Sequence, residues 1–395
     1  MYVSGITSKK QDWLLIIFAV WFSVEILFNT TIESVGGIPK DTINSFANLL
    51  VTSMLIVQIA GLQRYTRTEL LLIVAVTIVL LVSAFNSKRL SIVSTWMFIV
   101  STKEAEYEQL IRLAKRILQI CVPLVILMYF LGLIENYTMY RGAELRHSLG
   151  FSHPNQLGLR IFQWTACCVY LTRKRCLKLL EIMVYFACIF FVYFVPNSQS
   201  AALCLLLLVS GVLFLQLSDR HRRVQRLFAL FSVGGAAATN FISVVLSCIQ
   251  LSKYPLLVRI DRFLSFRFSE GHKILEKYGI KWLGQMVYVS KEERKLAGIT
   301  EQLFLDNSYM TLLIRYGIAA YLLFTVCFLL LFWRLYRLER YRLILILSVY
   351  AVYGIMENSV YMITHNIFLI TMGIFLYWQC DSQPETELLP EIRKR

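Results

Sequence analysis

Apolar stretches alternate with short polar segments along the whole chain. Most of these stretches approach the 20 or so residues that an α-helix needs to cross the hydrocarbon core of a bilayer. We therefore predict an all-α, polytopic integral membrane protein in which residues 1–395 form a single transmembrane domain. The predicted helices, about twelve in number, cover residues 13–30, 43–62, 70–86, 90–101, 117–135, 156–172, 179–195, 200–217, 227–248, 309–333, 342–358 and 364–379.

Basic residues mark one face of this predicted bundle. They fall into every second gap between the apolar stretches, and an excess of lysine and arginine is typical of cytoplasmic loops. We therefore predict that both termini are cytoplasmic and that residues 380–395 form a cytoplasmic tail. The groups on this face are Lys9, Lys10, Arg64, Arg67, Lys103, Arg112, Lys115, Arg116 and the basic clusters at 173–178, 220–226, 334–342 and 393–395.

The composition agrees with a membrane protein. The chain is 57% hydrophobic and only 16% charged, so it needs no soluble domain. A net charge of +15 would suit binding to nucleic acid. Because this charge is divided among several predicted cytoplasmic loops, membrane topology explains it, and we expect membrane lipid but no nucleic acid as a partner.

The opposite face holds a short external loop at 136–155 and a long external loop at 249–308. The stretch at 90–101 is short for a bilayer, but it must cross, because otherwise the later basic clusters would face outward. The segment at 104–118 places Leu110, Leu113, Ala114 and Ile117 opposite Arg112, Lys115 and Arg116. We predict that it is an interfacial helix lying on anionic lipid.

Several kinds of site are excluded by the motifs that the chain lacks. Its nine cysteines form no CxxC pair and do not alternate with histidine, so neither a zinc site nor a disulfide framework is indicated. Neither a P-loop nor a dinucleotide-binding glycine pattern is present. We expect no metal and no nucleotide cofactor.

The short external loop ends in a strong helix-start signal, His153-Pro154-Asn155. Proline favours the first position of a helix, so the next helix should begin at Pro154, and its free N–H groups should face outward and favour a phosphate. Arg160 would then lie about 9 Å deeper, on the same face as His153, Gln156 and Gln163. An arginine at that depth indicates a functional site. The alternatives are a simple helix cap and an arginine that pairs with a buried acid such as Glu357.

Charged residues gather in the long external loop as well. Two or more of its arginines, among them Arg259, Arg262 and Arg267, would clamp a pyrophosphate bidentately. The alternative is a solvated amphipathic helix. Asp306 or Asn307 would cap the tenth helix, with Arg315 two turns further along it. The segments 357–359 and 365–366 would complete the wall of a cavity or cap their own helices.

Three of these segments together resemble the Wzy-type polysaccharide polymerases of the O-antigen polymerase and ligase superfamily. The resemblance runs from about residue 85 to residue 375, and its motifs occur in the right order and on the right face. They are Arg146 with Ser148-Leu-Gly-Phe-Ser-His-Pro-Asn-Gln-Leu-Gly158, Arg267 with Tyr278-Gly-Ile-Lys-Trp-Leu-Gly-Gln285, and Asp306-Asn-Ser-Tyr-Met-Thr-Leu-Leu-Ile-Arg-Tyr-Gly317.

This resemblance implies a membrane glycosyltransferase that uses neither metal nor nucleotide. It would join oligosaccharide repeat units carried on undecaprenyl pyrophosphate into a surface polysaccharide, at the outer face of the bacterial cytoplasmic membrane. A flippase and a chain-length regulator would be its partners. One departure is Gln199, which stands where many relatives have the arginine of a Ser-Arg pair. Pyrophosphate binding would then depend more on Arg160 or Arg315.

The expected site follows from the chemistry of glycosyl transfer. Fixed cations stabilise the charge that develops on a pyrophosphate leaving group, and a general base activates the attacking sugar hydroxyl. The candidate bases are His153, His272 and Asp306. The candidate substrate-binding residues are Arg146, Asn155, Arg160, Arg267, Asn307, Tyr309 and Arg315.

Two other classes of function fit part of the pattern. A ligase of the same superfamily would transfer a finished glycan once, to a different acceptor. A transporter of lipid-linked oligosaccharide would carry its charges along a path across the membrane. The polar groups crowd the outer halves of the predicted helices, which favours an enzyme over a transporter.

Overall fold

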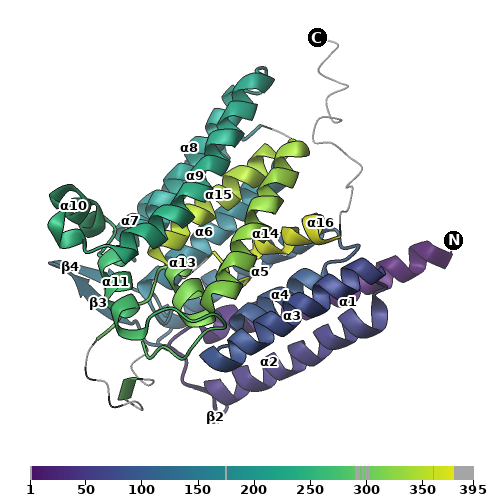
Figure 1. Cartoon of the computed structure of the whole chain (residues 1–395), viewed down its shortest axis with the longest axis horizontal. Coiled ribbons are helices and arrows are strands. Elements are labelled where there is room, and N and C mark those ends of the chain that lie inside the picture. Colours follow the sequence, from purple (N-terminus) through teal and green to yellow (C-terminus); the bar gives the residue numbers. More distant parts are fainter. Residues whose placement is uncertain are drawn as a thin grey trace.

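The computed structural model describes residues 2–173, 176–289, 294–295, 298, 300, 302–358 and 360–377, with side chains from residue 11 onward. The predicted tail at 380–395 and parts of the long external loop lie outside these residues. The described part is mostly helical, and six of its helices are long and apolar enough to cross a membrane. The fold class of an all-α membrane protein is therefore supported (Figure 1).

The N-terminal part contains α1 (Tyr2–Phe28), α2 (Lys40–Ile56) with the π-helical turn η1 (Val57–Leu62), α3 (Arg67–Ser87) and α4 (Ser91–Ser101). The central part contains α5 (Tyr107–Phe130), α6 (Pro154–Leu171), α7 (Leu179–Phe194), α8 (Gln199–Leu217) and α9 (Arg222–Cys248). The C-terminal part contains α13 (Ser308–Met310), the π-helical turn η3 (Thr311–Tyr316), α14 (Gly317–Arg337), α15 (Tyr341–Met356), the 3-10 helix η4 (Ile367–Met372) and α16 (Gly373–Leu376).

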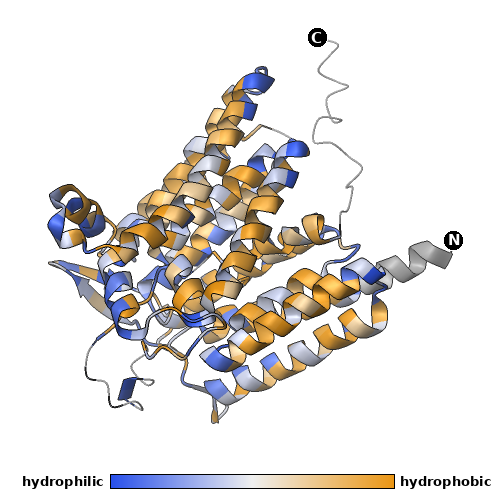
Figure 2. Cartoon of the chain, in the orientation of Figure 1, coloured by the Kyte–Doolittle hydropathy of each residue, from blue (hydrophilic) through white to orange (hydrophobic). Residues whose placement is uncertain are grey.

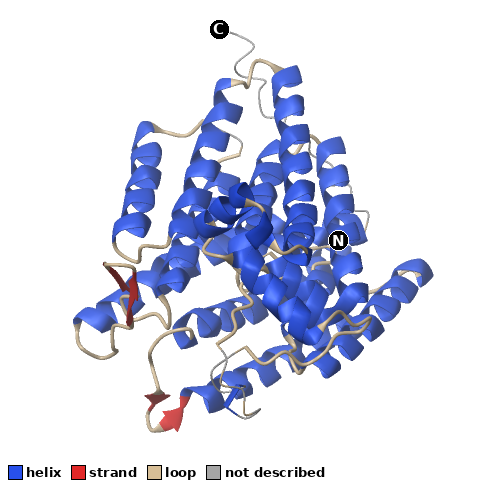
Figure 3. Cartoon of the chain, turned by 60° about the vertical axis from the view of Figure 1, so that its left-hand side comes forward, coloured by secondary structure: helices blue, strands red, loops and turns tan. Residues whose placement is uncertain are grey.

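The connections that the sequence predicts to be external carry structure of their own. The long one contains the 3-10 turn η2 (Leu251–Lys253), α10 (Pro255–Phe263) and α11 (Arg267–Tyr278). Two small antiparallel hairpins were not predicted: β1 (Ser34–Val35) with β2 (Ile38–Pro39), and β3 (Thr138–Arg141) with β4 (Glu144–His147). Figure 3 shows both pairs of strands towards the end of the molecule opposite the C-terminus.

The core is centred on α15, which packs against α6, α8 and α9. Nearly all of its residues are buried. Tyr350 and Tyr353 each meet Phe162 of α6 edge-on, with ring centroids 4.9 and 5.2 Å apart, a favourable arrangement of aromatic rings. The outer helices instead present apolar side chains, with Leu217 85% and Phe231 79% exposed. Apolar surface of this kind suits a lipid environment, and Figure 2 shows polar residues mainly at the helix ends and in the loops.

Each predicted apolar stretch overlaps a helix in the described residues, but these helices differ in length. Besides the six long helices, α4, α7, α15 and the η4–α16 segment are apolar but shorter. Helix α4 has 11 residues, about 16 Å at 1.5 Å per residue, against a hydrocarbon core of about 30 Å. Twelve crossings, including one at 90–101, therefore remain a prediction.

Two predicted elements differ in the structure. The segment at 104–118 is not a separate interfacial helix, because α5 runs unbroken from Tyr107 to Phe130. Its apolar side, including Leu110, Ala114 and Ile117, is buried within the protein core and is not free to lie on lipid. The twelfth predicted helix, 364–379, is reduced to η4 and α16 in the described residues, which start only at Ile367.

The tenth predicted helix is interrupted at Gly317, where two of the sequence motifs meet. Gly317 has φ of 93°, and Gly284 of the long connection, with φ of 81°, lies against it. Backbone hydrogen bonds join the two segments, from Gln285 N to Arg315 O at 2.9 Å and from Ile318 N to Lys281 O at 3.1 Å. The motif at 278–285 therefore supports the start of α14, and side chains at both glycines would prevent this close approach.

Candidate functional site

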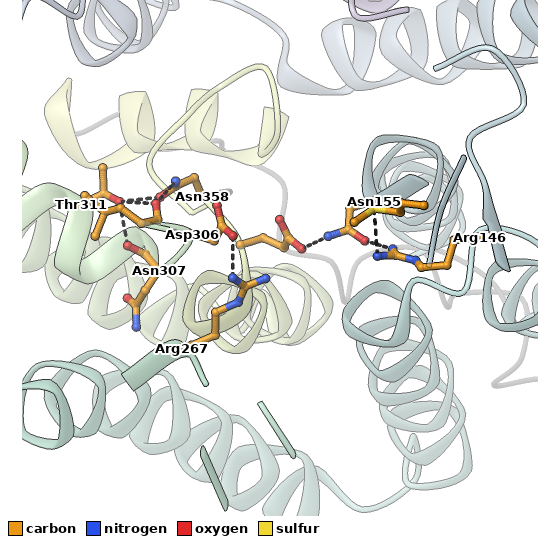
Figure 4. Close-up of polar contacts among 10 residues, drawn as sticks. Arg146, Asn155, Arg267, Asp306, Asn307, Thr311 and Asn358 are labelled. Carbon is orange, nitrogen blue, oxygen red and sulfur yellow. Dashed lines mark hydrogen bonds and ion pairs between the residues drawn. The ribbon is translucent and has the colours of Figure 1, made fainter. Parts of the chain in front are cut away.

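Polar side chains from several chain segments meet at one end of the bundle. They lie where α6 and α13 begin and where α15 ends, together with β4 and the start of α11. The charge pattern of the sequence predicts that these ends face outward. Figure 4 shows Arg146, Asn155, Arg267 and Asp306 in one row.

Arg146 on β4 begins this row and is bound closely by the protein. Its Nε donates to the backbone oxygen of Pro196 at 3.0 Å, and its Nη2 donates to Oδ1 of Asn155. The amide nitrogen of Asn155 in turn donates to Oε1 of Glu357, which caps the C-terminus of α15. Arg146 is 2% exposed, so its guanidinium is a buried cation whose hydrogen bonds go mostly to neutral groups.

Arg267, the first residue of α11, lies at the other end of the row. Its Nη1 forms an ion pair of 2.5 Å with Oδ2 of Asp306. The side chain of Arg267 is 13% exposed and that of Asp306 40%, so the pair borders the surface. The Nε of Arg267 is buried and has no hydrogen-bond partner among the described residues. Arg267 therefore has an unused donor, whereas the nitrogens of Arg146 are occupied by protein acceptors.

Local hydrogen bonds fix the position of Asp306. As predicted, Asn307 caps the next helix, its Oδ1 accepting from the backbone N–H groups of Tyr309 at 3.0 Å and Met310 at 3.2 Å. Asn358, just after α15, donates to the backbone oxygen of Leu305 and accepts from the Thr311 hydroxyl at 2.7 Å. The segment that carries Asp306 is thus tied to the end of α15 that carries Glu357.

His153 caps α6, which begins at Pro154 as predicted. Its Nδ1 accepts from the backbone N–H of Asn155 at 3.1 Å, so the remaining proton of the neutral ring is on Nε2. Burial, and then the positive charge of Arg146, lower the pKa of His153 to about 4. A group with this pKa is a weak base at neutral pH, so His153 serves better as a helix cap and hydrogen-bond donor than as a general base.

Glu357 has the opposite electrostatic character. Burial, and then the negative charge of Asp306, raise the pKa of Glu357 to about 8, although Arg267, Arg146 and Arg141 oppose this shift. Burial lowers the pKa of Arg146 to about 10, so it remains charged at neutral pH. A carboxyl group whose pKa is near the working pH suits proton transfer. Of the groups in this row, Glu357 has the chemistry of a general base.

Four predicted site residues lie apart from this row. Arg160 is fully buried inside the bundle, where it donates to Gln163 and to the backbone oxygen of Thr364, both at 2.8 Å. The acid whose charge acts on it is Glu25 of α1, not the proposed Glu357. The other three bind backbone oxygens elsewhere. Arg315 donates to the backbone oxygen of Val287 at 3.0 Å, and the Tyr309 hydroxyl donates to the backbone oxygen of Ala351 at 2.8 Å. Nδ1 of His272 lies 3.0 Å from the backbone oxygen of Ser247.

Two charged residues of the site were not among the predicted ones. Arg141 at the end of β3 donates to the backbone oxygen of Asn197 at 3.2 Å, and its charge acts on Arg267 and Glu357. Glu357 had been considered as a partner of Arg160, as part of a cavity wall or as a helix cap, but not as a catalytic group. The signal that could have singled it out is an acidic residue at the outer end of an apolar helix, opposite several external arginines.

Comparisons with known proteins give no assignment for this chain. No family model, no curated protein and no solved structure matches it. The likeness to the polysaccharide polymerases therefore depends on the three sequence motifs alone, and any function must be argued from the geometry of the site.

Proposed function

We propose that this protein polymerises oligosaccharide repeat units carried on undecaprenyl pyrophosphate, at the outer face of a bacterial cytoplasmic membrane. The observation that carries the proposal is the row from Arg267 and Asp306 through Glu357 to Arg146. It combines a half-buried arginine that borders the surface with a half-buried carboxyl group of raised pKa, at one end of an apolar helical bundle. These are the groups that transfer of a sugar from a lipid pyrophosphate requires.

In the proposed reaction, a hydroxyl oxygen of one repeat unit attacks the anomeric carbon of another. A glycosidic C–O bond forms as the C–O bond to the pyrophosphate breaks, and the lipid pyrophosphate leaves with the bonding electrons. Glu357 in its ionised form accepts the hydroxyl proton. The guanidinium of Arg267, whose side chain is 13% exposed, binds the leaving phosphate oxygens, and the charges of the buried Arg146 and the half-buried Arg141 add to the positive potential.

The first test is to reconstitute the purified protein in lipid nanodiscs with an undecaprenyl-pyrophosphate repeat unit, without nucleotide or added metal. The expected product is a ladder of glycans, because repeated transfer adds one unit at a time. A single product formed only with another acceptor would indicate a ligase. Unchanged glycan together with translocation in sealed vesicles would indicate a transporter, and either result would contradict the proposal.

Glu357 gives the proposed reaction a defined pH dependence. Because the base must be deprotonated and its pKa is raised to about 8, the rate should increase with pH up to about 8 and then level off. Glu357→Gln should lower the rate by about 100-fold and remove this dependence. The control is Glu144→Gln, since Glu144 is an exposed acid of β4 whose carboxylate accepts a hydrogen bond from Asn197. A wild-type rate that is flat between about pH 6 and 9 would exclude Glu357 as the base.

A further inference from the structure

An apolar groove lies beside the candidate site, between α7, α8 and α10. Its volume is about 550 Å³. It is lined mainly by apolar side chains of α7 and α8, among them Phe190, Phe194 and Leu206, and by Phe263 and Arg262 at the end of α10. Phe190 is 60% and Leu206 46% exposed, so the groove opens on the apolar flank of the bundle.

The inner end of the groove adjoins the row of site residues. Met356 lines the groove and directly precedes Glu357, and Gln199 lines it directly after Ser198. The hydroxyl of Ser198 donates to Oδ1 of Asn155 at 3.3 Å, the same oxygen that accepts from Arg146. An elongated molecule could therefore occupy the groove with one end at Glu357 and Asn155.

Helix α10 bounds the groove and has the character of an interfacial helix. Leu256, Ile260 and Phe263 follow one another at i, i+4 and i+7, so they share one face, and they are 69, 41 and 73% exposed. Arg259 and Arg262 flank this face, where their charged ends can reach lipid phosphates. Figure 1 shows α10 at the margin of the bundle, beside α7. An exposed apolar face bordered by arginines fits the surface of a bilayer.

We propose that this groove binds the polyprenyl chain of the lipid-linked substrate, which enters sideways from the bilayer between α10 and the helices α7 and α8. The groove is mainly apolar, and the neighbouring site is positively charged, so the two together match an amphiphile with an anionic headgroup. The identity of the lipid as a polyprenyl pyrophosphate rests on the proposed function, whereas binding of a lipid chain in the groove does not.

The groove is connected to Arg267 through the turn between α10 and α11. Leu264 and Ser265 line the groove, and Arg267 follows two residues later. Ser265 and Phe266 have φ of 58 and 62°, a left-handed conformation that is unfavourable for such residues. Asp261 holds the turn by accepting from the backbone N–H groups of Phe268 at 2.9 Å and Ser269 at 3.2 Å. A chain seated in the groove thus contacts the turn that positions Arg267.

The test compares two substitutions on the same helix. Leu206 lines the groove, whereas the neighbouring Leu207 does not, and they are similarly exposed, at 46 and 39%. The probe is undecaprenyl pyrophosphate without sugar, and native mass spectrometry of the protein from nanodiscs counts the bound lipid. Leu206→Trp should weaken binding by at least about tenfold, because the indole ring fills the groove, and Leu207→Trp by less than about twofold.

A second measurement covers the case in which Leu206→Trp lowers the yield of folded protein. Benzoylphenylalanine placed at position 206 should cross-link to the same lipid on illumination, and at position 207 it should not. Three results would overturn the proposal. They are equal binding of the probe by both tryptophan variants, equal cross-linking at both positions, and displacement of the probe by equimolar phosphatidylglycerol. Selective binding without any glycan ladder would support the groove and contradict the polymerase. A glycan ladder that both tryptophan variants form at the wild-type rate would support the polymerase and contradict binding of the lipid chain in the groove.

Discussion

Arg267→Ala is expected to reduce chain growth by at least about 100-fold while the protein still inserts and folds. Arg267 is a cation of the site that borders the surface, with its side chain 13% exposed, so its loss removes a positive charge that a leaving pyrophosphate can reach. Its partner Asp306 is 40% exposed, and the substitution therefore leaves no buried charge unpaired. The measurement is the glycan ladder formed from the lipid-linked repeat unit, normalised to folded protein from size-exclusion chromatography.

Two variants show whether the loss of chain growth in Arg267→Ala is due to the charge and the planar guanidinium group of Arg267. Lys273→Ala on the same helix removes a cation that pairs with Glu270 at the surface, and a surface pair contributes little, so its activity should stay close to that of the wild type. Arg267→Lys should retain part of the activity, because lysine supplies the charge but not the bidentate geometry. Polymer of normal length and amount from Arg267→Ala would remove this residue from the mechanism.

Gly317→Ala is expected to lower the stability of the folded protein by more than about 2 kcal/mol. A Cβ atom at this position would lie 2.3 Å from the amide nitrogen of Gly284 and 2.6 Å from the carbonyl oxygen of Trp282. Both are backbone atoms of a segment held to α14 by hydrogen bonds, among them the bond from Ala319 N to Trp282 O at 3.0 Å, so neither can move aside cheaply. The φ of 93° is also unfavourable for alanine. The added methyl group should push the segment around Gly284 away from the start of α14. This change should lower both the unfolding temperature and the yield of monodisperse protein.

Gly235→Ala provides the matched control. Gly235 lies within α9, and a Cβ atom there would meet nothing within 4 Å. Because alanine favours a helix over glycine by about 1 kcal/mol, this variant should be as stable as the wild type or slightly more so. Both variants are compared by thermal unfolding in the same detergent. Equal unfolding temperatures for Gly317→Ala and wild type would show that the contact between Gly284 and Gly317 can relax.

Local signals in the sequence were sufficient for the helix boundaries next to the site. The start of α6 at Pro154 and the cap at Asn307 follow from residues that satisfy or replace backbone N–H groups in the first turn. These interactions join residues two or three positions apart, so no tertiary information is required. The interruption at Gly317 was missed, because it depends on a loop segment more than 30 residues earlier.

The composition of the site was only partly predictable. Arg146, Asn155, Arg267 and Asp306 were identified and come together, whereas Arg160 and Arg315 were identified on similar grounds and lie elsewhere. A helical pattern gives the depth and face of a side chain but not the neighbour that this face meets. Glu357 was not chosen as a base because its raised pKa comes from burial and from Asp306, which is distant in sequence.

The sequence by itself indicated a helical protein with helices apolar enough to cross a membrane, and with its charges concentrated in a few segments between them. Hydropathy and charge act through the bilayer, which sorts each segment according to its own composition. Only the tertiary structure decided which of those charges share a site, that α5 is a single helix packed inside the bundle, and that an apolar groove adjoins Glu357. These features arise from packing between distant segments, and the composition of a single segment does not encode them.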